Sequence, residues 1–354
     1  MKNNPGKIIL AFPQYETASN GSMTEYFVLL KQELTALGLT VLEGIPENYG
    51  GLLNLFLKKN ARMEMLAVRL VGLLGGWLPM YWAFLAFLPN GCDDFHIVAI
   101  SQEYAPYCHK RKSIVIAHDM IQLKFPRSRL TYLFYKFFVL WSLRHCQKVI
   151  TVSNYSKKLL AHECVESEVV YNFFDFHRLA FALRKLNVVR NKKQILWIGT
   201  DAAHKSIETL LEAAKQLEDY RFIAVLPKIN DSLHGKITHN VSLRSRVSPE
   251  DLVVLYSSSN IFVSSSLEEG YGRPAMEARY FGCGLVLSDI PIYRELHSNY
   301  AFFFTPGNVK SLIEKIVLIT VMDGGLDTEF DWSRVAERDQ LAKKINEYIV
   351  VTAN

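Results

Sequence analysis

Short apolar runs of strand length alternate with helical stretches along this chain of 354 residues, and the pattern starts twice. In the first half the candidate strands are 7–12, 95–100, 113–117, 148–152 and 168–171. After a polar, basic passage at 184–193 they are 194–198, 221–226, 241–247, 261–264, 285–288 and 301–304. Such alternation is typical of parallel strands that helices cover on both faces. The sequence therefore predicts an α/β protein with two Rossmann-like, doubly wound domains.

The polar passage divides the chain into an N-terminal domain at 1–185 and a C-terminal domain at 186–330. A chain of this length exceeds what one hydrophobic core usually holds. The last segment, 331–354, has apolar residues at helical spacing, and we expect a helix there that packs back on the N-terminal domain or on its neighbour. Hydrophobic residues make up 49% of the chain and charged residues 21%, which favours a fold without disordered regions.

The cysteines and the N-terminal residues bear on the compartment. Five scattered cysteines form no C-x-x-C pair, which argues against a disulfide framework and a structural zinc site. The apolar run at 8–12 is too short for the core of a signal peptide. We therefore expect a cytoplasmic protein.

Two apolar stretches raise the question of a membrane. Segment 70–92 has no charged residue, but glycines and Pro79 interrupt it, so a buried hairpin or a membrane-surface segment fits better than a span. Segment 130–143 combines aromatic residues with nearby cations, which suits the cytoplasmic surface of a membrane. The alternative is that both stretches are ordinary core. The net charge of +5 fits either reading, and no nucleic-acid motif accompanies it.

Three loops at the ends of expected strands carry residues of the kinds that bind ligands or take part in catalysis. In the loop 266–278, glycines allow close backbone approach to a ligand, and Glu269 and Glu277 flank the turn. They form a paired-carboxylate site or merely cap a helix start. In the loop 199–206, Lys205 neutralises a phosphate or is simply solvated. The third loop begins at His118, which is expected to face the cleft between the two domains, while Asp119 next to it is expected only to cap the following turn.

Four ordered segments resemble one known family. Residues 269–277 are similar to the E-x7-E motif of retaining glycosyltransferases of family 4, also called glycosyl transferases group 1, with Tyr271 in place of a phenylalanine. Segments 115–126, 150–157 and 248–256 are similar to further conserved stretches of that family. The resemblance implies the GT-B architecture, in which two Rossmann-like domains face each other, the first on the acceptor side and the second binding the nucleotide sugar.

The resemblance also implies roles for individual residues. The residues expected to take part in catalysis are His118, Glu269 and Lys205. Those expected to bind the donor are His204, Lys205, Gly270, Tyr271, Gly272, Arg273, Glu277, Gly21 and Ser22. In this assignment Glu277 binds the ribose, the amides of 270–273 assist, and Gly21 with Ser22 matches the glycine loop of the first domain.

The family needs no metal ion or other cofactor, because basic side chains and helix N-termini stabilise the departing diphosphate. No metal-binding D-x-D occurs in a suitable loop of this chain. Two departures from the family pattern concern phosphate binding. His204 stands where an arginine is usual, so a weaker, titratable group replaces a permanent charge, and the first glycine loop has one glycine where many relatives have two.

The expected function is retaining transfer of a hexose, with mannose favoured, from a nucleotide-diphosphate sugar to a glycan acceptor. The acceptor is expected to be a polyprenyl-linked saccharide in the synthesis of a cell-surface polysaccharide or O-antigen. Two alternatives remain at this stage: a non-catalytic scaffold of a glycan-assembly complex, which the histidine at 204 favours, and a sugar-nucleotide epimerase, which the E-x7-E segment disfavours.

Overall fold

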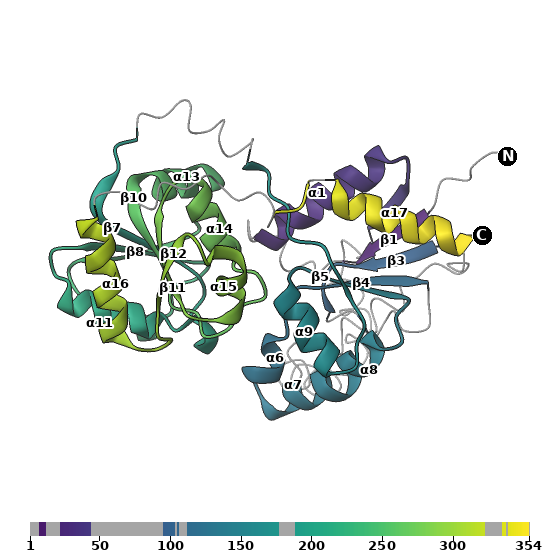
Figure 1. The fold of residues 1–354 in the computed structure, drawn as a ribbon, viewed down its shortest axis with the longest axis horizontal. Helices are drawn as coiled ribbons and strands as arrows, with labels where there is room; N and C mark the ends of the chain where they lie inside the picture. The colour runs from purple at the N-terminus through teal and green to yellow at the C-terminus, as the bar shows by residue number, and fades with distance from the viewer. Residues whose placement is uncertain are drawn as a thin grey trace, which may run out of the picture. The chain divides into compact units, whose positions relative to one another are not determined.

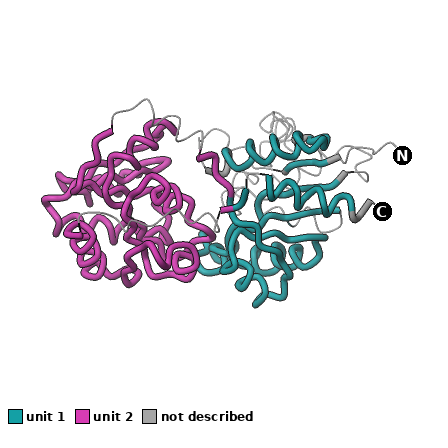
Figure 2. Tube along the Cα trace, turned by 45° about the horizontal axis from the view of Figure 1, so that its top comes forward, with its two compact units in different colours: residues 1–172, 336–354 teal, residues 173–335 magenta. Residues whose placement is uncertain are grey.

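The computed structural model describes residues 7–11, 22–43, 95–102, 105, 112–176, 188–322, 335–337 and 339–353. The chain forms two compact units (Figure 2): unit 1 comprises residues 1–172 and 336–354, and unit 2 comprises 173–335. The sequence places the junction at 185/186, later than the observed 172/173. The difference arises because Phe173 and Phe174 contact Arg273 of unit 2.

Unit 1 contains a six-stranded sheet in which all neighbouring strands are parallel. Its order is β2-β1-β3-β4-β5-β6, with the strands β1 (Lys7–Ala11), β2 (Thr40–Glu43), β3 (Phe95–Ala99), β4 (Ser113–Ala117), β5 (Lys148–Thr151) and β6 (Glu168–Val169). Every residue of β4 is buried, as expected for a central strand that is covered on both faces.

The helices of unit 1 begin where the sequence supplies caps. Ser128 accepts a hydrogen bond from the Thr131 amide at 3.1 Å, and Ser153 accepts one from the Ser156 amide at 3.0 Å. The elements are α1 (Ser22–Ala36), α6 (Ile121–Lys124), α7 (Arg129–Phe134), the π-helix η4 (Tyr135–Val139), α8 (Leu140–Leu143), α9 (Asn154–His162) and α17 (Gln340–Ala353).

The last helix, α17, returns to unit 1 and packs beside α1 (Figure 1). A cluster of charges fastens it to the sheet. The carboxylate of Glu168 in β6 accepts hydrogen bonds from Tyr348 and Lys344 of α17, the latter at 2.9 Å, and pairs with Lys148 of β5 at 3.3 Å. The chain therefore leaves unit 1 after 172 and comes back to it for the final helix.

Unit 2 contains a second parallel sheet of six strands with the order β12-β11-β10-β7-β8-β9. The strands are β7 (Asn191–Ile198), β8 (Arg221–Leu226), β9 (Val241–Ser245), β10 (Ser259–Ser264), β11 (Gly284–Ser288) and β12 (Ala301–Phe304). Counted along the chain, this is the 3-2-1-4-5-6 order of the dinucleotide-binding fold. The strand order reverses between β7 and β10, and ligands bind at such a point in open α/β sheets.

The helices of unit 2 cover this sheet (Figure 1). They are α11 (Ile207–Gln216), α12 (Asp231–His234), α13 (Pro249–Ser258), α14 (Arg273–Tyr280), α15 (Pro291–His297) and α16 (Val309–Val321). Helices α11 and α16 share one core with alternate residues of the strands, such as Ile195 and Trp197 of β7. This period of two identifies the residues that lie on the same face of the sheet, while Leu196 between them is buried on the opposite face.

The predicted fold class, α/β with two doubly wound sheets, is confirmed. Strand β7 begins at Asn191, before the expected 194, because Asn191 pairs with Ser259 of β10. Segment 70–92 lies outside the described residues. Among those that are described, no helix has the length and apolar character needed to cross a membrane.

Candidate active site

Two loops meet at the point where the strand order of unit 2 reverses. Strands β7 and β10 are adjacent and parallel, so the loops that follow them, 199–206 and 265–272, leave the same edge of the sheet. The Leu267 amide donates a hydrogen bond to the His204 carbonyl at 2.7 Å, and the Ser265 hydroxyl donates to the Lys205 carbonyl at 2.9 Å. These bonds join the two loops through their backbones and hold their side chains in fixed positions.

Lys205 and Glu269 form an ion pair across the two loops. The ammonium of Lys205 donates to Oε1 of Glu269, and the side chains are only 17% and 10% exposed. The Ser266 hydroxyl donates to the same carboxylate oxygen at 2.8 Å. Because little water reaches the pair, its charges interact more strongly than those of a surface ion pair. The sequence predicted both residues for the site, and the fold brings them into contact.

Lys205 owes its position to a short helical turn. The 3-10 helix η5 (Ala203–Lys205) ends at Ser206, whose φ of 46° is left-handed, and α11 starts at Ile207. Such a φ is uncommon for a residue other than glycine and is found where the surroundings fix the backbone. The turn places Lys205 beside the strand ends, two residues before the first residue of α11.

A buried tyrosine supports the glutamate loop from α15. The hydroxyl groups of Tyr293 and Ser264 lie 2.6 Å apart. Burial, and then the nearby charge of Glu269, raises the pKa of Tyr293 well above its usual value. Tyr293 therefore keeps its proton at neutral pH and remains a neutral hydrogen-bonding group next to the carboxylate.

Gly272 leaves the space that Tyr293 occupies. A Cβ atom at Gly272 would lie 2.5 Å from Cε1 of Tyr293, and the glycine has a φ of +80°. A side chain at this position would therefore meet both a steric clash and an unfavourable backbone conformation. Because Gly272 also caps the N-terminus of α14, the glycine sets how the helix begins.

Glu277 lies one turn inside α14 and is held by a second buried tyrosine. The Tyr256 hydroxyl of α13 donates to Oε2 of Glu277 at 2.8 Å, and the glutamate is only 9% exposed. Burial, and then the charge of Glu277, raises the pKa of Tyr256 well above its usual value. The tyrosine thus acts as a permanent hydrogen-bond donor to this carboxylate.

The side chain of Arg273 faces the first residues of unit 2. Its guanidinium donates to the Phe173 carbonyl at 3.1 Å and lies 4.3 Å from the ring centroid of Phe174. Tyr271, which is 3% exposed, lies 6.0 Å from the same ring. In this arrangement the side chain of Arg273 anchors the segment that leads into unit 2.

The remaining predicted residues belong to unit 1. His118 follows β4, its ring packs edge-on against Tyr26 at 5.1 Å, and its amide donates to Oε1 of Gln102 at 3.0 Å. Ser22 is the first residue of α1, and Gly21 lies outside the described residues. These residues therefore belong to a different unit from Lys205, Glu269 and Glu277.

Sequence reasoning missed the residues that hold the two glutamates. Ser266 donates to Glu269 and Tyr256 donates to Glu277, while Ser264 hydrogen-bonds with Tyr293 beside them. One available signal was the run of three serines at 264–266, directly after an apolar strand. The tyrosines gave no such signal, because a tyrosine on an amphipathic helix usually indicates core. No group of three or more metal-binding side chains occurs within the part of the chain that the structure describes.

Comparison with known proteins agrees with this geometry. Residues 181–324, which cover most of unit 2, match the family described as glycosyl transferases group 1. The O-antigen chain mannosyltransferase RfbU of Salmonella typhimurium strain LT2 is 26% identical over 216 residues, which are 57% of this chain and 59% of that protein. The serotype-specific mannosyltransferase WbdA of Escherichia coli is 31% identical over 134 residues, which are 34% of this chain and 16% of that protein. The matches thus span only part of both relatives.

Solved structures share the fold over nearly the whole chain. The sucrose-phosphate synthase of Thermosynechococcus elongatus is similar with a TM-score of 0.69 at 16% identity, over 98% of this chain and 94% of that one. Anabaena Alr3699/HepE, solved in complex with UDP and glucose, is similar with a TM-score of 0.61 at 16% identity, over 98% and 99%. At such low identity these likenesses establish the architecture alone.

Proposed function

We propose that this chain, whose residues 181–324 match the glycosyl transferases group 1, is a retaining glycosyltransferase that uses a nucleotide-diphosphate sugar. The observation that carries the proposal is the contact between Lys205 and Glu269 where the strand order of unit 2 reverses, with Glu277 one turn inside the adjoining helix. A cation and a helix N-terminus suit the diphosphate of such a donor, and two fixed carboxylates suit the hydroxyl groups of its ribose and its sugar.

The diphosphate of the donor needs positive charge. The N-terminus of α14 offers N–H groups and the positive end of the helix dipole, and Lys205 adds a full charge nearby. Glu277, held by Tyr256, would accept hydrogen bonds from the ribose hydroxyls. Glu269, held by Ser266, would contact the transferred sugar.

During transfer, the bond between the anomeric carbon and the phosphate oxygen breaks while the acceptor hydroxyl bonds to that carbon from the same face. The hydroxyl proton passes to the departing diphosphate. Lys205 and the N–H groups of α14 stabilise the negative charge that develops on the leaving group, which is where electrostatic catalysis is most effective. Because these groups supply the charge, we propose that the reaction requires no metal ion.

For the sugar and the acceptor, we propose mannose and a lipid-linked glycan of O-antigen synthesis at the cytoplasmic face of a membrane. The support is that two relatives are named mannosyltransferases, one of them of the O-antigen chain. In this proposal His118, with Gly21 and Ser22, contributes from unit 1 to the reacting sugar and the acceptor side.

A thermal-shift screen tests the proposal. The full chain is heated with GDP-, UDP-, dTDP- and ADP-linked sugars in the presence of EDTA, because a ligand that binds the folded state raises the melting temperature. We expect one nucleotide class to raise it and both Lys205→Ala and Glu277→Ala to abolish the effect. Lys215→Ala serves as the control, since Lys215 lies on the same unit but pairs with exposed Glu212. No shift with any donor would contradict the proposal.

One observation favours a second function, that of a non-catalytic scaffold. His204 replaces the usual arginine, and the neighbouring cation Lys205 is already paired with Glu269. A scaffold would show no donor-induced shift at either acidic or alkaline pH, and Lys205→Ala would change only the stability of the chain. An enzyme would show the shift and would lose it with the lysine.

A further inference from the structure

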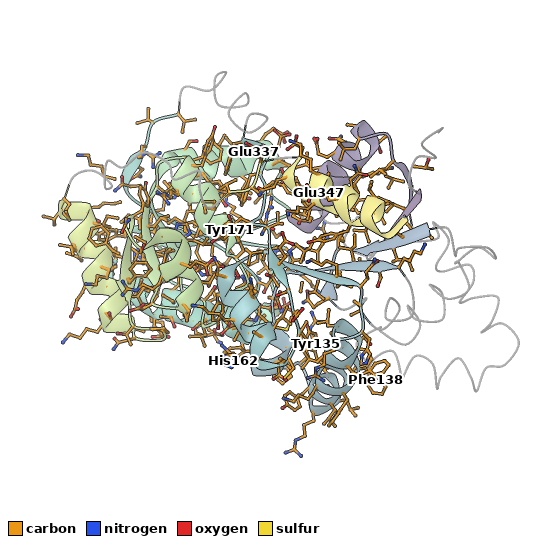
Figure 3. All side chains as sticks on the ribbon, turned by 45° about the vertical axis from the view of Figure 1, so that its right-hand side comes forward. Tyr135, Phe138, His162, Tyr171, Glu337 and Glu347 are labelled. Atoms are coloured by element: carbon orange, nitrogen blue, oxygen red, sulfur yellow. The ribbon has the colours of Figure 1, made fainter. Side chains whose placement is uncertain are left out.

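One helical segment of unit 1, residues 129–143, has apolar residues on two sides. It consists of α7, η4 and α8, which follow one another without a break. Its inner side belongs to the core, where Tyr135, Val139, Leu140 and Leu143 are at most 2% exposed. Its outer side carries a second apolar set that is 43–65% exposed: Leu130, Leu133, Phe137, Phe138 and Trp141. Figure 3 labels Tyr135 of the inner side and Phe138 of the outer side.

The outer set, which we call the aromatic face, is not needed to hold the segment in place. A surface helix usually has a single apolar stripe that faces the core, and here Tyr135 and Val139 already provide it. Phe137 and Phe138 are 65% and 59% exposed, so most of each ring lies outside the core, and Phe138 stacks on Phe134 with the ring centroids 5.6 Å apart. Large exposed apolar groups that gather on one side of an element indicate an interaction surface.

The charges around the aromatic face indicate the chemistry of its partner. Between residues 120 and 162 the chain has eight lysines and arginines and no aspartate or glutamate. Arg127 and Arg129 are exposed at the start of the segment. Lys136 and Arg144 lie 3.2 and 3.8 Å from Glu163, and both keep more than a third of their side chains exposed. The surroundings of the aromatic face therefore carry more cations than carboxylates, because Lys136 and Arg144 share the one carboxylate of Glu163 and Arg127 and Arg129 add two further charges.

Cations beside exposed aromatic rings match the interface of a bilayer that contains anionic lipids. Aromatic side chains prefer the boundary between headgroups and acyl chains, and each nearby lysine or arginine is attracted by the negative surface potential. An acidic protein surface would satisfy the cations but would leave the rings of Phe137, Phe138 and Trp141 without an apolar environment. The combination of both features favours the membrane surface.

We propose that the aromatic face binds the surface of a membrane with anionic phospholipids. Phe137, Phe138 and Trp141 enter the headgroup boundary, and Arg127 and Arg129 contact lipid phosphates. This binding goes beyond the proposed function and would keep unit 1 on the surface where a lipid-linked acceptor is presented. Because vesicle binding requires neither donor nor acceptor, it can fail or succeed independently of sugar transfer.

Cosedimentation of the full chain with vesicles tests the proposal. The vesicles contain phosphatidylcholine alone or phosphatidylcholine with phosphatidylglycerol, at low and at high salt. We expect binding to the anionic vesicles, and a loss of about thirtyfold or more in affinity for Phe137→Ser/Phe138→Ser, since two exposed rings lose their burial. The control is Val321→Ser/Met322→Ser, which removes side chains of 76% and 53% exposure from unit 2 and should bind like the wild type.

A charge variant tests the cationic part separately. Arg127→Glu/Arg129→Glu should weaken binding to anionic vesicles at low salt, and the difference should shrink as salt rises, because salt screens exposed charges. All of these side chains are exposed, so circular dichroism should show unchanged folding.

Three results would overturn the proposal: a wild-type chain that stays in the supernatant, a Phe137→Ser/Phe138→Ser variant that binds as well as the wild type, or equal binding to both kinds of vesicle. A wild-type oligomer that the aromatic variant loses would assign the aromatic face to a second copy instead.

Discussion

Replacing Gly272 by alanine should destabilise unit 2 more than a comparable replacement elsewhere in that unit. Alanine at a φ of +80° costs about 1–2 kcal/mol of unfolding free energy, because the left-handed conformation brings Cβ close to the following carbonyl oxygen. The new Cβ would also lie 2.5 Å from Cε1 of Tyr293. Overpacking of this kind adds about 1–3 kcal/mol. We therefore expect Gly272→Ala to lose about 2–5 kcal/mol in total.

Gly307→Ala is the matched control. Gly307 also has a positive φ, +73°, but nothing lies within 4 Å of its added Cβ, so only the backbone cost of about 1–2 kcal/mol applies. Urea unfolding of both variants, with hydrogen exchange of β10 amides to assign the transition to unit 2, measures the difference. Tyr293→Ala removes the atom that clashes, so the combined Gly272→Ala/Tyr293→Ala variant should lose less than the two single losses together. Equal losses for Gly272→Ala and Gly307→Ala would refute the steric argument.

Three further predictions concern buried and paired ionisable groups. Tyr256→Phe removes the hydroxyl that donates a hydrogen bond to Glu277, so urea unfolding should show a loss of about 1–3 kcal/mol in the free energy of unfolding. The affinity for the nucleotide sugar should fall as well, and an unchanged affinity would show that the tyrosine does not position the carboxylate. The hydroxyl of Tyr348, with two lysines, lowers the pKa of Glu168 from 4.5 to about 2. The stability that Glu168 contributes is therefore present above pH 4.5 and is lost as the pH falls towards 2, and a melting series should show that Glu168→Gln lacks this loss. Burial, and then a nearby arginine, lowers the pKa of His297 from 6.5 to about 3. Unit 2 should therefore lose stability as the pH falls from 6.5 to 3, because the unfolded chain binds a proton that the folded chain does not. In a melting series, His297→Leu should remove that part of the loss.

The architecture and the meeting of the two site loops could be predicted from the sequence. Strands such as β4 and β10 are short apolar runs between polar turns, and the doubly wound order that they imply makes β7 and β10 neighbours. Once those strands are adjacent, the loops that carry Lys205 and Glu269 must lie together. The proximity of the loops follows from the topology, whereas the ion pair between the two side chains is seen only in the structure.

The supporting residues could not be predicted in this way. Tyr256 and Tyr293 come from helices that follow other strands, and only the packing of α13 and α15 brings their hydroxyls to Glu277 and Ser264. The segment 130–143 was open to two readings, core or membrane interface. In the structure the inner side of this segment is buried in the core, and the aromatic face is exposed. The sequence could not separate the two, because periodicity alone does not distinguish a buried apolar stripe from an exposed one on the same helix.

The central claim is that Lys205 recognises a donor diphosphate while Glu277 recognises the attached nucleoside. Calorimetric titration in EDTA, with the nucleotide that the thermal screen selects, compares the nucleoside diphosphate with the monophosphate. A charge-assisted hydrogen bond to phosphate accounts for about ten- to a hundredfold in affinity. Lys205→Met should therefore remove most of the preference for the diphosphate, Glu277→Gln should weaken both ligands equally, and Lys215→Met should change neither. A Lys205→Met variant that keeps the full preference for the diphosphate would contradict the assignment of this site.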